Sequence, residues 1–286
     1  MNNSSIFQID SDIVKKEYNN DNYLIEYDSN AKDKKSCVVY FSSNDIYFPN
    51  QEEVFEARIV SLNFFEWYKN RINGAYKHIF LRDIKKQWYI EGINAKINTP
   101  ELLKAFLVEE TKGFSTVMLG SSAGGYAAVL YGSILNVERV YSFNGQTELN
   151  SLIQTSSYSI DPLIFRYHQT SLSKYFDLKE FINPKVSIYY FVSILSAWDK
   201  QQYDHIKKLN ILKAIPFKTG HHGIPFLKAA LPLVINLPAK ELEKWVEKKH
   251  HPIIFSARLL GVSKTFAALN KQVFSLIKKK ISRFMK

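Results

Sequence analysis

The fold is decided by the stretch Thr116-Val117-Met118-Leu119-Gly120-Ser121-Ser122-Ala123-Gly124-Gly125-Tyr126. Four residues of strand composition run into a Gly-x-Ser-x-Gly motif, and small residues of helical character follow to Leu130. In a strand-turn-helix of this kind the serine is held in strained backbone geometry, with its Oγ above the sheet edge. The flanking Gly120 and Gly124 avoid Cβ atoms that would collide with the neighbouring strand or helix. We therefore interpret Ser122 as the candidate nucleophile, with a plain glycine-rich turn as the alternative.

Composition indicates one large α/β domain, or one domain with an appendage. The chain has 286 residues, of which 46% are hydrophobic and 14% aromatic, enough for a sizeable core. The single cysteine, Cys37, lies in an apolar run, so we expect a buried thiol and a reducing compartment. The polar start, Met1 to Ser5, lacks the apolar core of a signal peptide, and no apolar window is long enough to span a membrane. These features predict a cytoplasmic protein.

The net charge of +11 is concentrated near the C-terminus. From Lys248 to Lys286 there are ten Lys or Arg and no Asp or Glu, so the preceding 247 residues carry about +1. Apolar residues in this tail recur every three or four positions, at Phe266, Leu269, Val273, Ile277, Ile281 and Phe284. A basic amphipathic helix over 264–286 suits an anionic membrane surface, and packing on the body is the alternative. No nucleic acid is expected, and a peripheral position on the inner membrane is our hypothesis.

Strand-like and helix-like stretches alternate along the body. The strand-like stretches are 22–27, 36–41, 77–83, 116–119, 139–143, 186–195 and 211–218, and the helical ones include 55–68, 99–112, 202–209 and 225–231. This alternation predicts a mostly parallel, doubly wound α/β sheet with helices on both faces, and Pro216 places the last strand at an edge. Residues 147–184 lose the alternation and are predicted to form a cap over the crevice. We expect a catalytic domain over 1–238 and a basic helical extension over 239–286.

A serine hydroxyl needs a base, and the base needs a third group that fixes its tautomer. His221 and His222 occupy a Gly-flanked turn beyond the last strand, and Asp199 follows the strand before it. The order Ser122, Asp199, histidine is the one expected of an α/β-hydrolase architecture. Spacing does not decide between the two histidines, and we favour His222 because it directly precedes the helix entry.

Other assignments around this constellation remain open. Asp204 is the rival acid, but it falls about a turn further along a helical stretch. A metal site is disfavoured, because a His-His dipeptide points its side chains apart and no further His or Cys pattern supports one.

Two loops are expected to complete the site. The amide of Ala123 is the first candidate for an oxyanion hole, and an amide near Ser42 or Ser43 is the second, with ordinary turn residues as the alternative. Trp88 and Tyr89 follow a strand end, where amphipathic rings stack on a sugar, although packing beneath the loop is the commoner fate.

The chain resembles the α/β-hydrolase superfamily over about residues 36–231. The residues that carry the likeness are Leu119-Gly120-Ser121-Ser122-Ala123-Gly124-Gly125-Tyr126-Ala127-Ala128, Trp198-Asp199 and Gly220-His221-His222-Gly223-Ile224-Pro225. More narrowly, it is similar to small α/β-hydrolase-like proteins of bacterial capsule and surface-polysaccharide clusters, including capsule O-acetyltransferases. That resemblance implies acetyl transfer from acetyl-CoA, through an acyl-serine, onto a polysaccharide or glycolipid hydroxyl. Two other functions stay open: a carboxylesterase or deacetylase with the same residues, and a non-catalytic assembly protein of the same fold.

Overall fold

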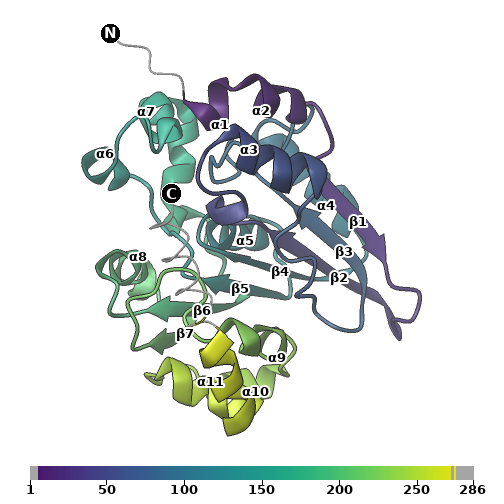
Figure 1. Cartoon of the computed structure of the whole chain (residues 1–286), viewed down its shortest axis with the longest axis vertical. Coiled ribbons are helices and arrows are strands. Elements are labelled where there is room, and N and C mark those ends of the chain that lie inside the picture. The colour runs from purple at the N-terminus through teal and green to yellow at the C-terminus, as the bar shows by residue number, and fades with distance from the viewer. Residues whose placement is uncertain (1–5, 272–273, 275–286) are drawn as a thin grey trace.

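The computed structural model of the chain describes residues 6–271 and residue 274 (Figure 1). Most of the predicted amphipathic tail helix, including Val273, Ile277, Ile281 and Phe284, lies outside the described residues.

A seven-stranded sheet runs through the molecule in the order β1-β3-β2-β4-β5-β6-β7. The strands are β1 (Tyr23–Tyr27), β2 (Asp33–Phe41), β3 (Ala75–Leu81), β4 (Ser115–Ser121), β5 (Arg139–Phe143), β6 (Ser187–Ser193) and β7 (Leu212–Phe217). Only β1 runs antiparallel to its neighbour, β3, and the other described pairs are parallel. The carboxyl ends of the parallel strands therefore meet at one edge, where ligands of such sheets bind.

The sheet is buried on both faces, because alternate residues of a strand point to opposite sides. In β2, Val39 and Phe41 pack into one core with α4 and α5, whereas Val38 and Tyr40 pack into the other. Cys37 belongs to the first core and is fully buried, which raises the pKa of its thiol to about 12. The prediction of a buried thiol is confirmed.

Helices of different length cover the sheet. The α-helices are α1 (Phe7–Asp10), α2 (Asp12–Glu17), α3 (Glu52–Phe55), α4 (Pro100–Thr111), α5 (Ala123–Ile134), α6 (Leu152–Thr155), α7 (Pro162–Tyr167), α8 (Ala197–Lys207), α9 (Leu231–Ile235), α10 (Ala239–Glu243) and α11 (Pro252–Leu260). Short helical turns of other types are η1 (Asn44–Ile46), η2 (Glu56–Ser61), η3 (Ser171–Phe176), η4 (Leu178–Glu180) and η5 (Lys228–Ala230). Figure 1 shows α9, α10 and α11 gathered beside β7.

The sequence predicts the sheet well and two helices poorly. All seven predicted strands are present, β7 lies at an edge of the sheet, and Thr99 caps α4 by accepting a hydrogen bond from the Leu102 amide. The predicted helix over 55–68 is wrong in extent. The chain there forms α3 and the π-helical η2, and the positive φ of Asn63 prevents the helix from continuing. The predicted helix over 225–231 is displaced, since residues 222–226 form bends and helical structure begins only with η5 at Lys228 and α9 at Leu231.

The two predicted appendages are only partly ordered into helices. Residues 147–184 hold α6, α7, η3 and η4 separated by turns, and their role as a cap remains a prediction. Beyond β7 the chain forms α10, α11 and a helical stretch over 262–271, in which the Phe266 ring is 63% exposed. Across residues 6–271 and 274, no helix has both the length and the apolar character needed to cross a bilayer.

Candidate active site

The turn between β4 and α5 has the strained geometry that the motif predicts. Ser122 has φ +54° and ψ −123°, in a region that side-chain-bearing residues rarely adopt. A Cβ on Gly120 would lie 2.2 Å from the Gly124 carbonyl group, and one on Gly124 would lie 2.3 Å from the Phe41 carbonyl oxygen. The predicted reason for the two glycines is confirmed, since β4, α5 and β2 meet too closely here for larger residues.

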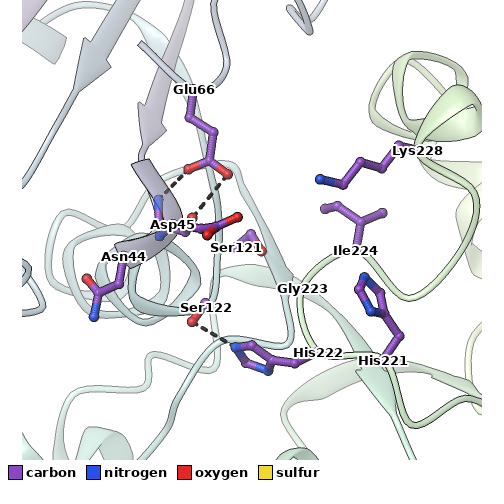
Figure 2. A pocket seen from close by; sticks show the side chains of 11 residues that line it. Asn44, Asp45, Glu66, Ser121, Ser122, His221, His222, Gly223, Ile224 and Lys228 are labelled. Carbon is purple, nitrogen blue, oxygen red and sulfur yellow. Dashed lines mark hydrogen bonds between the residues drawn. The ribbon is translucent and has the colours of Figure 1, made fainter. Parts of the chain in front are cut away.

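The Ser122 hydroxyl is the first member of a hydrogen-bonded chain of three side chains. His222 Nε2 lies 2.9 Å from Ser122 Oγ (Figure 2), and His222 Nδ1 lies 2.7 Å from Asp199 Oδ1. This network fits the tautomer in which Nδ1–H donates to the carboxylate while Nε2 accepts from the hydroxyl. The structure thus brings together the three residues that the sequence predicts, and it favours His222 over His221 as the partner of Ser122.

Neighbouring residues at the start of α8 fix the positions of Asp199 and His222. Asp199 lies in the first turn of α8 rather than in the strand-end loop, and it is 1% exposed. Its amide donates to the Ser196 hydroxyl at the start of the helix. The Trp198 ring packs 5.1 Å from the His222 ring, centroid to centroid, so the imidazole has a fixed neighbour on one side.

The alternative base, His221, and the alternative acid, Asp204, are not part of this hydrogen-bonded chain. The His221 ring is exposed and points away from Ser122 (Figure 2), while the His221 carbonyl accepts a 2.6 Å hydrogen bond from the Ser193 hydroxyl. Partial desolvation of the ring by the surrounding protein, followed by the charge of Lys228, lowers the pKa of His221. Asp204 forms an ion pair with Lys200 on the exposed face of α8, and no hydrogen bond or ion pair joins it to either histidine among the described residues.

The predicted oxyanion hole needs one correction. Among the described residues, the Ala123 amide at the start of α5 donates to no acceptor, so it is free for a ligand. Ser42 is wrong as the second donor, because its amide donates to the Leu81 carbonyl at 3.1 Å. Ser43, the next residue, lines the cavity, and its amide donates to Glu66 Oε2 at 2.5 Å.

Trp88 and Tyr89 do not form a sugar platform, and that prediction is wrong. Trp88 is 3% exposed and Tyr89 is fully buried. The indole N–H of Trp88 donates to Gln146 Oε1 at 3.1 Å, and the Tyr89 hydroxyl donates to the Ser42 carbonyl at 2.9 Å. Both residues therefore support the site from beneath rather than line it.

Four residues of the site were missed by sequence reasoning. Gln146 follows the carboxyl end of β5 and donates to Ser122 Oγ at 3.2 Å, so the strand-end rule could have found it. Asp45, Glu66 and Lys228 line a cavity of about 340 Å³ at Ser122, and nothing in their spacing indicates it (Figure 2). The remaining lining residues are Ser43, Asn44, Ser121, Ser122, His221, His222, Gly223 and Ile224. None of the residues that line this cavity comes from the predicted cap, residues 147–184.

The cavity carries charges of both signs. Burial raises the pKa of Glu66, although the amide and hydroxyl of Ser43 oppose that rise by donating to its carboxylate. Lys228 approaches from η5 on the other side. Within the described residues no group of three His, Cys, Asp or Glu side chains is arranged to hold a metal ion.

The sheet order, the serine turn and the placement of the site at the strand ends define an α/β-hydrolase-like protein. No protein-family model matches the sequence, and no curated protein matches it. Among solved structures, the chain is similar to the capsule O-acetyltransferase of Neisseria meningitidis serogroup A, with 14% identity over 79% of this chain and 92% of that one, and a TM-score of 0.51. A fluorophosphonate-binding serine hydrolase of Staphylococcus aureus matches with 12% identity over 77% of this chain and 98% of that one, and a TM-score of 0.42. At these identities the likeness extends to the fold alone.

Proposed function

We propose that this chain is a serine acyltransferase that acetylates a hydroxyl of a bacterial surface polysaccharide through an acyl-serine at Ser122. The observation that carries the proposal is the chain of 2.9 Å and 2.7 Å contacts from Ser122 through His222 to Asp199. Such a relay activates a serine for acyl chemistry, because the imidazole takes the hydroxyl proton and the carboxylate stabilises the resulting cation.

The reaction follows from the geometry. His222 Nε2 takes the Ser122 proton as Oγ attacks the acyl carbonyl, and the carbonyl oxygen gains negative charge facing the Ala123 amide. Collapse breaks the bond to the leaving group, which receives the proton from His222. His222 then takes a proton from the acceptor hydroxyl, whose oxygen attacks the acyl-serine and frees Ser122. With water as the acceptor, the same steps make an ester hydrolase.

Several residues fit acetyl-CoA as the donor and a glycan as the acceptor. Lys228 lines the cavity itself, and Lys218, Lys249 and Arg258 line a separate cleft. Cations so placed suit the phosphates of a CoA. On the opposite wall Asn44 and Asp45 offer polar groups suited to sugar hydroxyls. The comparison with a capsule O-acetyltransferase is consistent with this donor and acceptor at the level of the fold.

The test follows the acetyl group to its product. The protein would be incubated with acetyl-CoA and with candidate surface glycans, and acetyl-glycan, free acetate and free CoA would be quantified. We expect glycan-dependent acetyl transfer that Ser122→Ala abolishes and that Ser29→Ala, an exposed serine in a turn, leaves intact. Free acetate that forms at the same rate without glycan would identify a hydrolase. No turnover, with unchanged polysaccharide chemistry in Ser122→Ala cells, would favour the non-catalytic role.

We also propose that the basic C-terminal stretch holds the enzyme at an anionic membrane surface, near its acceptor. The charge asymmetry of the chain and the exposed Phe266 support this. Sedimentation with vesicles of phosphatidylglycerol and phosphatidylcholine would be compared for the full chain and for a chain that ends at Val262. Equal sedimentation of both chains would reject the proposal.

A further inference from the structure

The amide of Ser43 lies beside the first turn of α5, where a second oxyanion donor is needed. The Ser42 carbonyl oxygen would be 2.9 Å from a Cβ on Gly124, so the peptide that joins Ser42 to Ser43 lies against the helix start. Ser43 and Ser122 line the same cavity. The Ser43 amide, at the wall of the cavity that holds Ser122, is therefore the candidate for a second donor beside the Ala123 amide.

In this structure the Ser43 amide already donates its hydrogen bond to the Glu66 carboxylate. Its Oε2 accepts from the Ser43 amide at 2.5 Å, and its Oε1 accepts from the Ser43 hydroxyl at 3.1 Å. The carboxylate comes from the loop after η2, where the neighbouring Trp67 is fixed by a 2.8 Å hydrogen bond from its indole N–H to the Phe41 carbonyl. Figure 2 shows the Glu66 side chain pointing toward Asp45.

An ionised carboxylate at this place conflicts with acyl chemistry. The Ser43 amide has one hydrogen, and a carboxylate that holds it leaves none for the developing oxyanion. The negative charge of Glu66 would also repel the oxyanion at close range. The contact satisfies a buried amide in the free protein, but it must break when the acyl group enters.

We infer that Glu66 is a removable cap on the oxyanion hole, which holds the Ser43 amide in the unliganded protein and releases it when the acyl group enters. This inference rests on the proposed function. Lys228 lines the same cavity and forms no ion pair with another described residue, so its ammonium group can receive the displaced carboxylate. Glu66 is on this account a positioning residue, since it acts only through the amide of Ser43.

The test uses proline to delete the amide hydrogen. Ser43 has φ −81°, close to the value that proline imposes, so Ser43→Pro removes the N–H donor with little change in φ. Ser43→Ala is the matched control, because it removes the hydroxyl and keeps the amide. The rate of Ser122 acylation by p-nitrophenyl acetate would be measured for both variants, for Glu66→Ala and for the double variant Ser43→Pro/Glu66→Ala.

We expect Ser43→Pro to lower the acylation rate by about 10²–10³-fold relative to Ser43→Ala, the usual loss for one oxyanion donor. Glu66→Ala should raise the rate several-fold when Ser43 is present and give no gain in the proline background. A gain or loss of the same size in both backgrounds would overturn the cap, as would an unchanged rate in Ser43→Pro with its melting temperature preserved. If wild-type Ser122 is never acylated, the proposed function fails instead.

The pH dependence supplies a readout that a purely structural role would not move. Glu66→Gln mimics the protonated carboxyl, so its acylation rate divided by that of the wild type should exceed one near neutral pH. The ratio should fall toward one as the pH drops through the raised pKa of Glu66, because the wild-type carboxylate is then neutralised as well. The other titratable and charged groups around Glu66 are present in both proteins, so their own titration acts on both rates: Asp45, Tyr89, His221, His222 and Lys228. A ratio that does not change with pH would overturn the inference.

Discussion

His222 Nε2 lies 2.9 Å from Ser122 Oγ, although a hundred residues separate the two in sequence. His221, its immediate neighbour, turns its ring away and is held by its carbonyl instead. If the contact is catalytic, His222→Ala should lower the acylation rate by about 10²–10⁴-fold, as expected for loss of a general base. His221→Ala is the adjacent control and should cost only a small part of that factor. Equal losses in the two variants, measured by stopped-flow release of p-nitrophenol, would contradict the assignment.

Asp199 should matter through the tautomer of His222. In Asp199→Asn the amide N–H₂ can face Nδ1, so the ring proton moves to Nε2, which then cannot accept from the Ser122 hydroxyl. We predict a loss of about 10²–10⁴-fold in acylation rate with little change in melting temperature. Asp204→Asn is the matched control on the same helix, because within the described part of the chain Asp204 pairs with Lys200 alone, at the surface. An Asp199→Asn variant as active as Asp204→Asn would rule out the predicted role.

The close approach of β2, β4 and α5 predicts a stability effect. A Cβ on Gly124 would lie 2.3 Å from the Phe41 carbonyl oxygen, so Gly124→Ala must push two backbone segments apart. We expect its free energy of unfolding in urea to fall by about 3 kcal/mol or more. A Cβ on Gly220 would have no atom closer than 3.6 Å, so Gly220→Ala should change the same quantity by less than about 0.5 kcal/mol. Similar values for the two variants would contradict the packing described here.

The strands and the catalytic order could be predicted from sequence because both follow from local pattern. Apolar runs mark the parallel strands, and their carboxyl ends place Ser122, Asp199 and His222 at one edge. The amide that serves as the second oxyanion donor and the residues that line the cavity could not be predicted. The register of β2 and β3 makes the Ser42 amide donate to the Leu81 carbonyl, so this amide is not free for an oxyanion. Glu66 accepts from the Ser43 amide, but it lies in a loop whose sequence has no periodic pattern that would predict the contact.

Trp88 and Tyr89 show a second limit of sequence reasoning. Both have positive φ, in a turn whose amides at Gln87 and Tyr89 donate to the buried Asp83 carboxylate at 2.6 and 2.9 Å. That turn folds the two rings inward, whereas composition alone suggests an exposed aromatic loop. The turn depends on a buried acid, Asp83, which the local sequence pattern does not reveal.

Asp83 should give the protein a measurable pH dependence of stability. Burial raises the pKa of its carboxyl from 3.8 to about 6, despite the amides that oppose the rise. Because the folded-state pKa lies above the unfolded one, the contribution of Asp83 is greatest below the unfolded pKa and is lost as pH rises through about 6. The unfolding free energy of the wild type minus that of Asp83→Asn should therefore fall by on the order of 3 kcal/mol between about pH 3.5 and 6.5. Urea titrations at both values test this, and a difference that stays flat or rises would contradict it.

The central claim is a covalent acyl group on one serine, and mass spectrometry tests it most directly. The full-length protein would be mixed with acetyl-CoA, quenched in acid, weighed intact and then digested. We predict an adduct of about +42 Da on the peptide that contains Ser122, absent in Ser122→Ala and accumulating when no acceptor is present. A protein that acquires no adduct from acetyl-CoA or from p-nitrophenyl acetate, or that carries it equally in Ser122→Ala, would contradict the account.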